Sequence, residues 1–149
     1  MTPFHPFLVH FALSLALLVG LGELFPNLRA RVPEKGWRLV DHAAILFLLL
    51  AALAGWSSLH TLASARSKIP PLVPLHRFLA IAGTAAYALL WLSAGRRVFA
   101  LPSGSRRMIG LAGLVLILSA AALGGHLVYE DRLGTDVRST APSVSTTLP

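Results

Sequence analysis

Histidine is the residue type in this chain with the most informative chemistry, because a neutral imidazole can bind a metal ion or haem iron and can exchange protons near neutral pH. The chain has six histidines. Five of them lie near the ends of long apolar runs that should meet at one membrane surface, namely His5, His10, His60, His76 and His126. Only His42 belongs to the opposite surface. Because unpartnered polar groups at the edge of hydrocarbon are costly, histidines gathered at one depth predict a binding site.

The absence of cysteine narrows the chemistry of such a site. It excludes disulfides, thiolate zinc sites, iron–sulfur clusters and the covalent attachment of c-type haem. The sequence also contains no phosphate-binding loop, no dinucleotide fingerprint and no nucleophile–base–acid arrangement. We therefore expect an electron-transfer or binding protein that is not a self-contained enzyme.

The elements that must position the histidines are membrane-spanning helices. Hydrophobic residues make up 55% of the chain, charged residues 13%, and the mean hydropathy is +0.70. A helix needs about 20 mostly apolar residues to cross a bilayer. The predicted fold is an all-α, four-helix transmembrane bundle over residues 1–134, followed by a disordered tail rich in serine, threonine and proline over 135–149. The four predicted spans are Phe7–Phe25, Leu39–Leu59, Phe78–Gly95 and Ile109–Tyr129.

The basic residues predict how these helices are oriented. Of the 13 lysines and arginines, eight fall in the first and third loops and five in the second loop and after the fourth helix. By the positive-inside rule, the bundle runs up-down-up-down with both termini outside the cytoplasm. The net charge of +7 is thus interpreted as a topology signal, and no nucleic-acid partner is expected.

Helical geometry separates the two histidines at the start of the first helix. His5 and His10 are five residues apart, about 140° around a helix axis, so they cannot share a face. His5 precedes Pro6, which favours an extended conformation, and is therefore expected in a cap at the surface. His10 lies within the first turns and is expected to face the interior.

The remaining histidines have distinctive neighbours. His76 follows a stiff, proline-rich segment that should fix its height. His126 follows Gly124 and Gly125, which remove side-chain bulk and would let a neighbouring helix or a flat cofactor approach the backbone. Other small residues, Gly83 and Gly110 among them, are interpreted as helix-packing faces.

Several of these segments resemble the bacterial membrane family called domain of unknown function 2231. The resemblance rests on His5-Pro6 with Val9-His10-Phe11, on Leu75-His76-Arg77, and on Gly124-Gly125-His126-Leu127-Val128-Tyr129, and it covers nearly the whole chain up to the tail. It implies a four-helix protein of the bacterial cytoplasmic membrane with a role in haem binding or electron transfer. The family often has a histidine shortly after the closing tyrosine, whereas Glu130 follows Tyr129 here, so His126 would have to replace it.

The leading hypothesis is therefore a b-type cytochrome with haem b near the outer surface, ligated by two imidazoles. His10 and His76 are the predicted ligands, His126 is the next choice, and His60 is a neighbour of the haem or a ligand to a second one. Arg77 and Arg66 would pair with the haem propionates. Electrons would pass between an outer donor and a quinone, a redox partner or a larger membrane complex.

Two other functions remain open from the sequence alone. A copper or zinc site could use the same imidazoles, with His10, His76 and His126 as ligands. Alternatively, the chain could be an accessory or structural subunit of a respiratory or photosynthetic complex, embedded in the lipid bilayer, whose histidines bind backbone carbonyls or lipid head groups.

Overall fold

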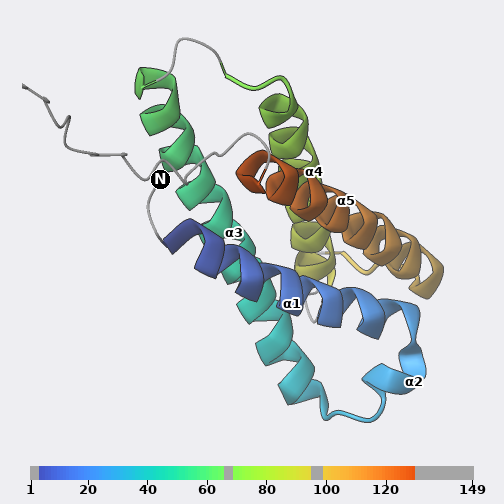
Figure 1. Ribbon diagram of the computed structural model, residues 1–149. Helices are drawn as coiled ribbons and strands as arrows, with labels where there is room; N and C mark the ends of the chain where they lie inside the picture. The colour runs from blue at the N-terminus through green and yellow to red at the C-terminus, as the bar shows by residue number, and fades with distance from the viewer. Residues whose placement is uncertain (1–3, 66–68, 95–98, 130–149) are drawn as a thin grey trace, which may run out of the picture.

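The computed structural model describes residues 4–65, 69–94 and 99–129, and every regular element in them is helical (Figure 1). Four of the helices are long and apolar enough to cross a membrane, which confirms the predicted number of spans. Arg66 and the predicted tail over 135–149 lie outside the described residues. The elements are α1 (Phe4–Leu24), the short α2 (Pro26–Arg29), α3 (Glu34–Ala65), α4 (Leu72–Ser93) and α5 (Ser103–Tyr129).

Prolines set most of the helix boundaries. Pro26 occupies the first turn of α2, where its missing N–H leaves no hydrogen bond unmade, and α1 ends two residues before it. Pro33 and Pro102 immediately precede α3 and α5. Pro6 and Pro74 lie in the first turns of α1 and α4, where proline is tolerated. The helices therefore begin earlier than the purely apolar runs indicate.

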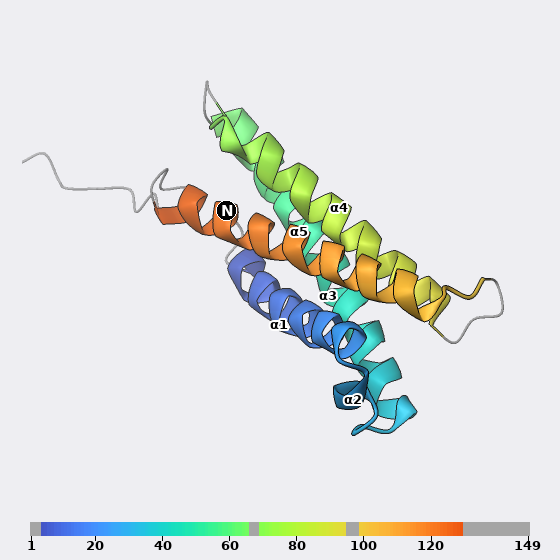
Figure 2. The same ribbon diagram turned by 90° about the vertical axis from the view of Figure 1, so that its right-hand side faces the viewer.

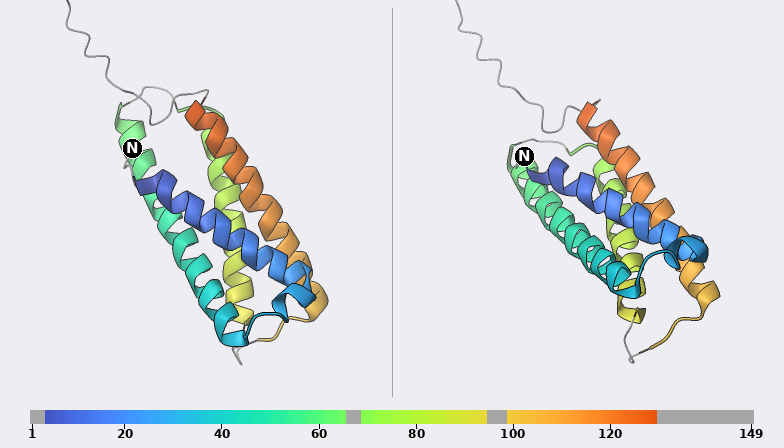
Figure 3. Two further views of the ribbon diagram at one scale, coloured as in Figure 1. Left: turned by 60° about the horizontal axis from the view of Figure 1, so that its bottom comes forward. Right: turned by 90° about the horizontal axis from the view of Figure 1, so that it is seen from below.

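The four long helices form a ring of neighbours (Figures 2 and 3). The closest pairs are α4 with α5 and α1 with α3, and the ring is completed by contacts of α1 with α5 and of α3 with α4. Consequently α1 and α4 lie diagonally and reach each other only across the middle of the bundle. There the Tyr87 hydroxyl of α4 donates a 2.7 Å hydrogen bond to the Ala16 carbonyl of α1.

Each long helix presents one inward stripe of residues spaced three and four apart, the pattern expected for helices that pack along their length. Small residues dominate the middle of these stripes. A Cβ added at Gly83 of α4 would lie 2.7 Å from Ile117 of α5, so glycine is needed for the close approach. This confirms that Gly83 belongs to a packing face. The stripe of α3 contains Trp37, Asp41, Ala44, Leu48, Ala51, Gly55 and Ser58, and that of α5 contains Arg106, Gly110, Gly113, Ile117, Ala120, Gly124 and Leu127.

The outer surface of the bundle is apolar. Leu39, Leu53 and Phe78 are 71%, 67% and 66% exposed, and most other exposed positions along the helices are also aliphatic or aromatic. A water-soluble bundle would hide such residues or replace them with polar ones. The exposed apolar surface is consistent with a multi-pass membrane protein.

One end of the bundle is tied together by buried ion pairs. We call it the ion-pair end; it is where α1 ends, α3 begins, α4 ends and α5 begins. Glu23 is only 7% exposed and accepts hydrogen bonds from two arginines. Arg106 of α5 binds both carboxylate oxygens of Glu23, and Arg29 of α2 donates a 2.7 Å bond to Oε1. Arg29 also reaches Asp41 of α3 at 3.2 Å, and Arg106 donates to Ser93 of α4 at 2.8 Å.

This cluster connects all five helices through paired charges. Two arginines face two carboxylates, so the buried charge is balanced, which is the condition under which such groups are tolerated. Gly110 makes room for it, because a Cβ there would lie 2.9 Å from the Cβ of Glu23. From the sequence alone Arg106 contributes only to the predicted topology, and no local pattern predicts the cluster.

Replacing Arg106 tests this cluster. Removing one partner of a buried ion pair costs about 3–5 kcal/mol, and we expect Arg106→Gln to lie near 3 kcal/mol because Arg29 still binds Glu23. Thermal unfolding of the detergent-purified protein measures the loss. The neighbouring exposed Arg107 is the control, and Arg107→Gln should change stability by less than about 0.5 kcal/mol. Equal stabilities of the two variants would contradict a stabilising role for the cluster.

Candidate functional site

At the opposite end of the bundle, α1 and α4 begin and α3 and α5 end (Figure 3, left). Five of the six histidines lie in the first or last turns of these helices at that end. We call it the histidine end. His5 is the innermost of them on α1. Counting along this helix, His5, Ala12, Ala16, Val19 and Glu23 follow one another at intervals of seven, four, three and four residues and so form its inward stripe. His5 therefore lies on the face whose far end carries the buried ion pairs.

The His5 ring packs against the backbone of α3. A Cβ added at Gly55 would lie 3.2 Å from Cε1 of His5, so the ring rests directly on this glycine. The Nδ1 atom of His5 is shielded from solvent, yet it has no hydrogen-bond partner among the described residues. A shielded nitrogen without a partner costs free energy unless a ligand, an ion or water completes it.

His76 faces the same interior from α4. Its Nδ1 lies 2.8 Å from the carbonyl oxygen of Ala120 on α5. A carbonyl can only accept a hydrogen bond, so Nδ1 carries the proton, and in the neutral ring Nε2 keeps its lone pair. A Cβ added at Gly124 would lie 3.0 Å from Cε1 of His76, so this ring also rests on a glycine.

His5 and His76 face the interior at the same end of the bundle, although they come from diagonally placed helices. The expectation that His5 caps the surface while His10 faces inward is reversed in the structure. His10 is exposed, and its Nδ1 donates to the Pro6 carbonyl of its own helix at 2.6 Å. The reason is that α1 already begins at Phe4, so His5 lies inside its first turn. With His5 facing inward, His10 lies about 140° away around the helix axis and therefore faces outward.

The other predicted site residues lie at the ends of the helices, outside the interior that His5 and His76 face. His60 and His126 are exposed at the ends of α3 and α5, and the His60 ring lies 6.0 Å from that of Trp56. A Cβ added at Gly125 would meet nothing within 4 Å, in contrast to its neighbour Gly124. Within residues 4–65, 69–94 and 99–129, no three histidines or carboxylates are grouped to hold a metal ion. The structure thus does not bring His10, His76 and His126 together.

Arg77 follows His76 and lies half-buried over the ring of Trp56, with its guanidinium carbon 4.0 Å from the ring centroid. Of the lysines and arginines in the described ranges, Arg77 is the one that lies at the histidine end. His42, as expected, lies apart from the other histidines, with its ring 5.6 Å from that of Trp91 toward the ion-pair end.

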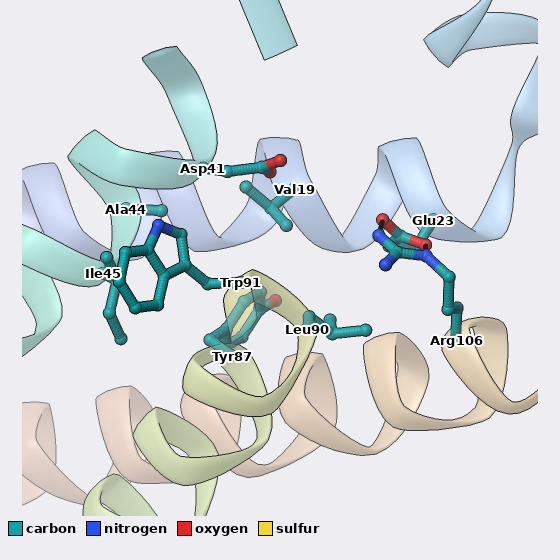
Figure 4. A pocket seen from close by; sticks show the side chains of 9 residues that line it. All are labelled: Val19, Glu23, Asp41, Ala44, Ile45, Tyr87, Leu90, Trp91 and Arg106. Carbon is teal, nitrogen blue, oxygen red and sulfur yellow. Dashed lines mark hydrogen bonds and ion pairs between the residues drawn. The ribbon is translucent and has the colours of Figure 1, made fainter. Parts of the chain in front are cut away.

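The ion-pair end also contains a small cavity, which Figure 4 shows between Glu23 with Arg106 on one side and Asp41 with Trp91 on the other. Its volume of about 10 Å³ matches a single water molecule. The carboxylates around it are already bound by arginines. This cavity therefore does not accommodate an organic cofactor, and the histidine end, where a shielded ring nitrogen has no partner among the described residues, is the better candidate for a functional site.

The signal that identifies His5 was present in the sequence. Extending the small-residue stripe of Ala12 and Ala16 back by seven positions reaches His5 and does not reach His10. For α4, a step of seven residues from Gly83 likewise reaches His76. The proline next to His5 favours an extended conformation there, and this preference leads to the wrong prediction that His10 faces inward.

No family model, no curated protein and no solved structure matches the chain. Membership in the domain of unknown function 2231 family stays a prediction that rests on the motifs around His10, His76 and His126.

Proposed function

We propose that this chain is a membrane-bound b-type cytochrome that holds haem between His5 and His76 at the histidine end. The observation that carries the proposal is that two imidazoles, one from α1 and one from α4, face the interior at the same end of the bundle, where the shielded Nδ1 of His5 has no hydrogen-bond partner among the described residues. Haem iron takes two axial ligands from the protein, whereas a copper or zinc site needs three or four. Two converging imidazoles therefore favour haem over a transition-metal ion.

The residues around the pair fit this cofactor. Gly55 and Gly124 carry no side chain, which lets the two imidazole rings pack directly against the backbones of α3 and α5. The Ala120 carbonyl fixes the proton of His76 on Nδ1, which leaves Nε2 as the ligating atom. A hydrogen bond of this kind also orients a ligating imidazole and raises its basicity.

When bound, haem would supply a one-electron ferric/ferrous couple at this end of the bundle. The chain itself would keep the two imidazoles oriented, and its apolar helices would exclude water from around them. Because His42 is the single histidine toward the opposite end among the described residues, a second bis-histidine haem there is not part of the proposal. Electrons would be exchanged at the same membrane surface, with a quinone, a redox partner or a larger membrane complex.

The proposal includes the orientation of the chain in a bacterial cytoplasmic membrane, with helices running up-down-up-down and both termini outside. The distribution of basic residues supports it, since the segment from α2 to the first turns of α3 contains Arg29, Arg31, Lys35 and Arg38, and the start of α5 contains Arg106 and Arg107. The chain lacks cysteine, so single cysteines can report the sides. An impermeant maleimide should label Ile69→Cys from outside and should not label Val32→Cys; the opposite pattern would invert the topology.

The haem proposal predicts a b-type reduced-minus-oxidised spectrum for protein purified from haem-replete cells, with one haem per chain by pyridine haemochrome assay. His5→Ala and His76→Ala should each lose most of the bound haem, because one axial ligand is removed. His10→Ala is the matched control and should retain it, since His10 is exposed and bonded to its own helix. A colourless wild-type protein would sink the proposal and leave an accessory-subunit role.

The adjacent glycines provide a second, subtler comparison. Gly124→Ala places a methyl group 3.0 Å from the His76 ring, so the ring must shift and haem affinity should fall severalfold. Gly125→Ala adds the same methyl group in open space and should leave haem content unchanged. Equal haem contents in the two variants would argue against ligation by His76.

A further inference from the structure

Among the described residues, two arginines lie over tryptophan rings, and only one of these two has an acidic partner there. Arg29 lies with its guanidinium carbon 5.1 Å from the centroid of Trp37, and its N–H groups donate to the carboxylates of Glu23 and Asp41. Contact with a ring face occupies none of the five N–H donors of a guanidinium, so an oxyanion can still bind at its edge. Arg29 thus contacts a tryptophan ring with its face and binds carboxylates with its N–H groups at the same time.

Arg77 has the same aromatic contact without the oxyanion. Its guanidinium carbon lies 4.0 Å from the centroid of Trp56, closer than that of Arg29 to Trp37. The acidic residues of the described ranges are Glu23, Glu34 and Asp41, and all three belong to the ion-pair end. Among residues 4–65, 69–94 and 99–129, no carboxylate therefore neutralises Arg77.

The surroundings of Arg77 strengthen the effect of its positive charge. The side chain is half-buried, so its charge is screened less than that of a fully exposed arginine. Trp56 is 51% exposed and lies in the last third of α3, where a tryptophan would be at the level of lipid head groups if the helices span a bilayer. A guanidinium held at that level, whose N–H groups bind no carboxylate within the part of the chain that the structure describes, matches the geometry and charge of a phosphodiester.

We propose that Arg77 and Trp56 form a binding site for the phosphate of an anionic phospholipid at the histidine end of the bundle. The guanidinium would donate hydrogen bonds to the phosphate oxygens, while the face of the Trp56 ring holds the guanidinium in position. This goes beyond the proposed haem function, because it needs neither His5 nor a bound cofactor. It assigns Arg77, expected from the sequence to bind a haem propionate, to a lipid.

Native mass spectrometry of the full chain in detergent, with added phosphatidylglycerol as the probe, tests the site. Arg77→Gln should bind the lipid about tenfold more weakly, the loss expected when one charge-assisted interaction worth about 1.4 kcal/mol is removed. Trp56→Leu should weaken binding severalfold, because the guanidinium is no longer held. Arg107→Gln, which removes an exposed arginine at the ion-pair end, should bind as the wild type does.

Further measurements separate the possible sources of the oxyanion. His5→Ala should retain the lipid, which shows that the site works without haem; loss of lipid only when haem is bound would instead assign Arg77 to a propionate and overturn the proposal. Displacement of the lipid by inorganic phosphate would indicate a site for free phosphate. Equal binding by Arg77→Gln and the wild type, or binding that appears only after residues 130–149 are removed, would also overturn it.

Discussion

The buried carboxylate of Glu23 is the constraint on which the arrangement of the helices depends. A charge that is 7% exposed in an apolar bundle must be neutralised by close partners, and Glu23 obtains them from α2 and α5. These bonds fix the end of α1 against the start of α5, and the bond from Arg29 to Asp41 adds the start of α3. With the rotation of α1 set at this end, the same face of the helix carries His5 into the interior at the other.

The two ends of the bundle thus solve the problem of polar groups in an apolar environment differently. At the ion-pair end every buried charge has a partner within the chain, and the remaining cavity is the size of a water molecule. At the histidine end the described residues leave several groups incomplete: Nδ1 of His5, the hydroxyl of Ser58 and the N–H donors of Arg77. Unsatisfied groups of this kind mark a place where something else binds. This contrast supports both proposals, haem at the imidazole pair and a lipid phosphate at Arg77.

Much of this structure could be predicted from sequence because it follows from composition and period. The four spans follow from apolar length, and packing faces such as that of Gly83 follow from small residues at helical spacing. The rotation of α1 was predictable in principle, since the stripe through Ala12 and Ala16 includes His5. Pro6 favours an extended conformation for the residue before it, and this local preference predicts the wrong position for His5, because proline is tolerated in the first turn of a helix. The cluster around Glu23 depends on contacts between residues up to 83 positions apart, which no local pattern specifies.

The central claim, that the imidazoles of α1 and α4 converge through His5, can be tested without any cofactor. Because the chain has no cysteine, a double variant with His5→Cys and His76→Cys contains the only two thiols, and a short thiol-specific crosslinker reports their proximity. The structure predicts efficient intramolecular crosslinking of this pair and little crosslinking when His10→Cys is combined with His76→Cys. More efficient crosslinking through position 10 than through position 5 would contradict the claim.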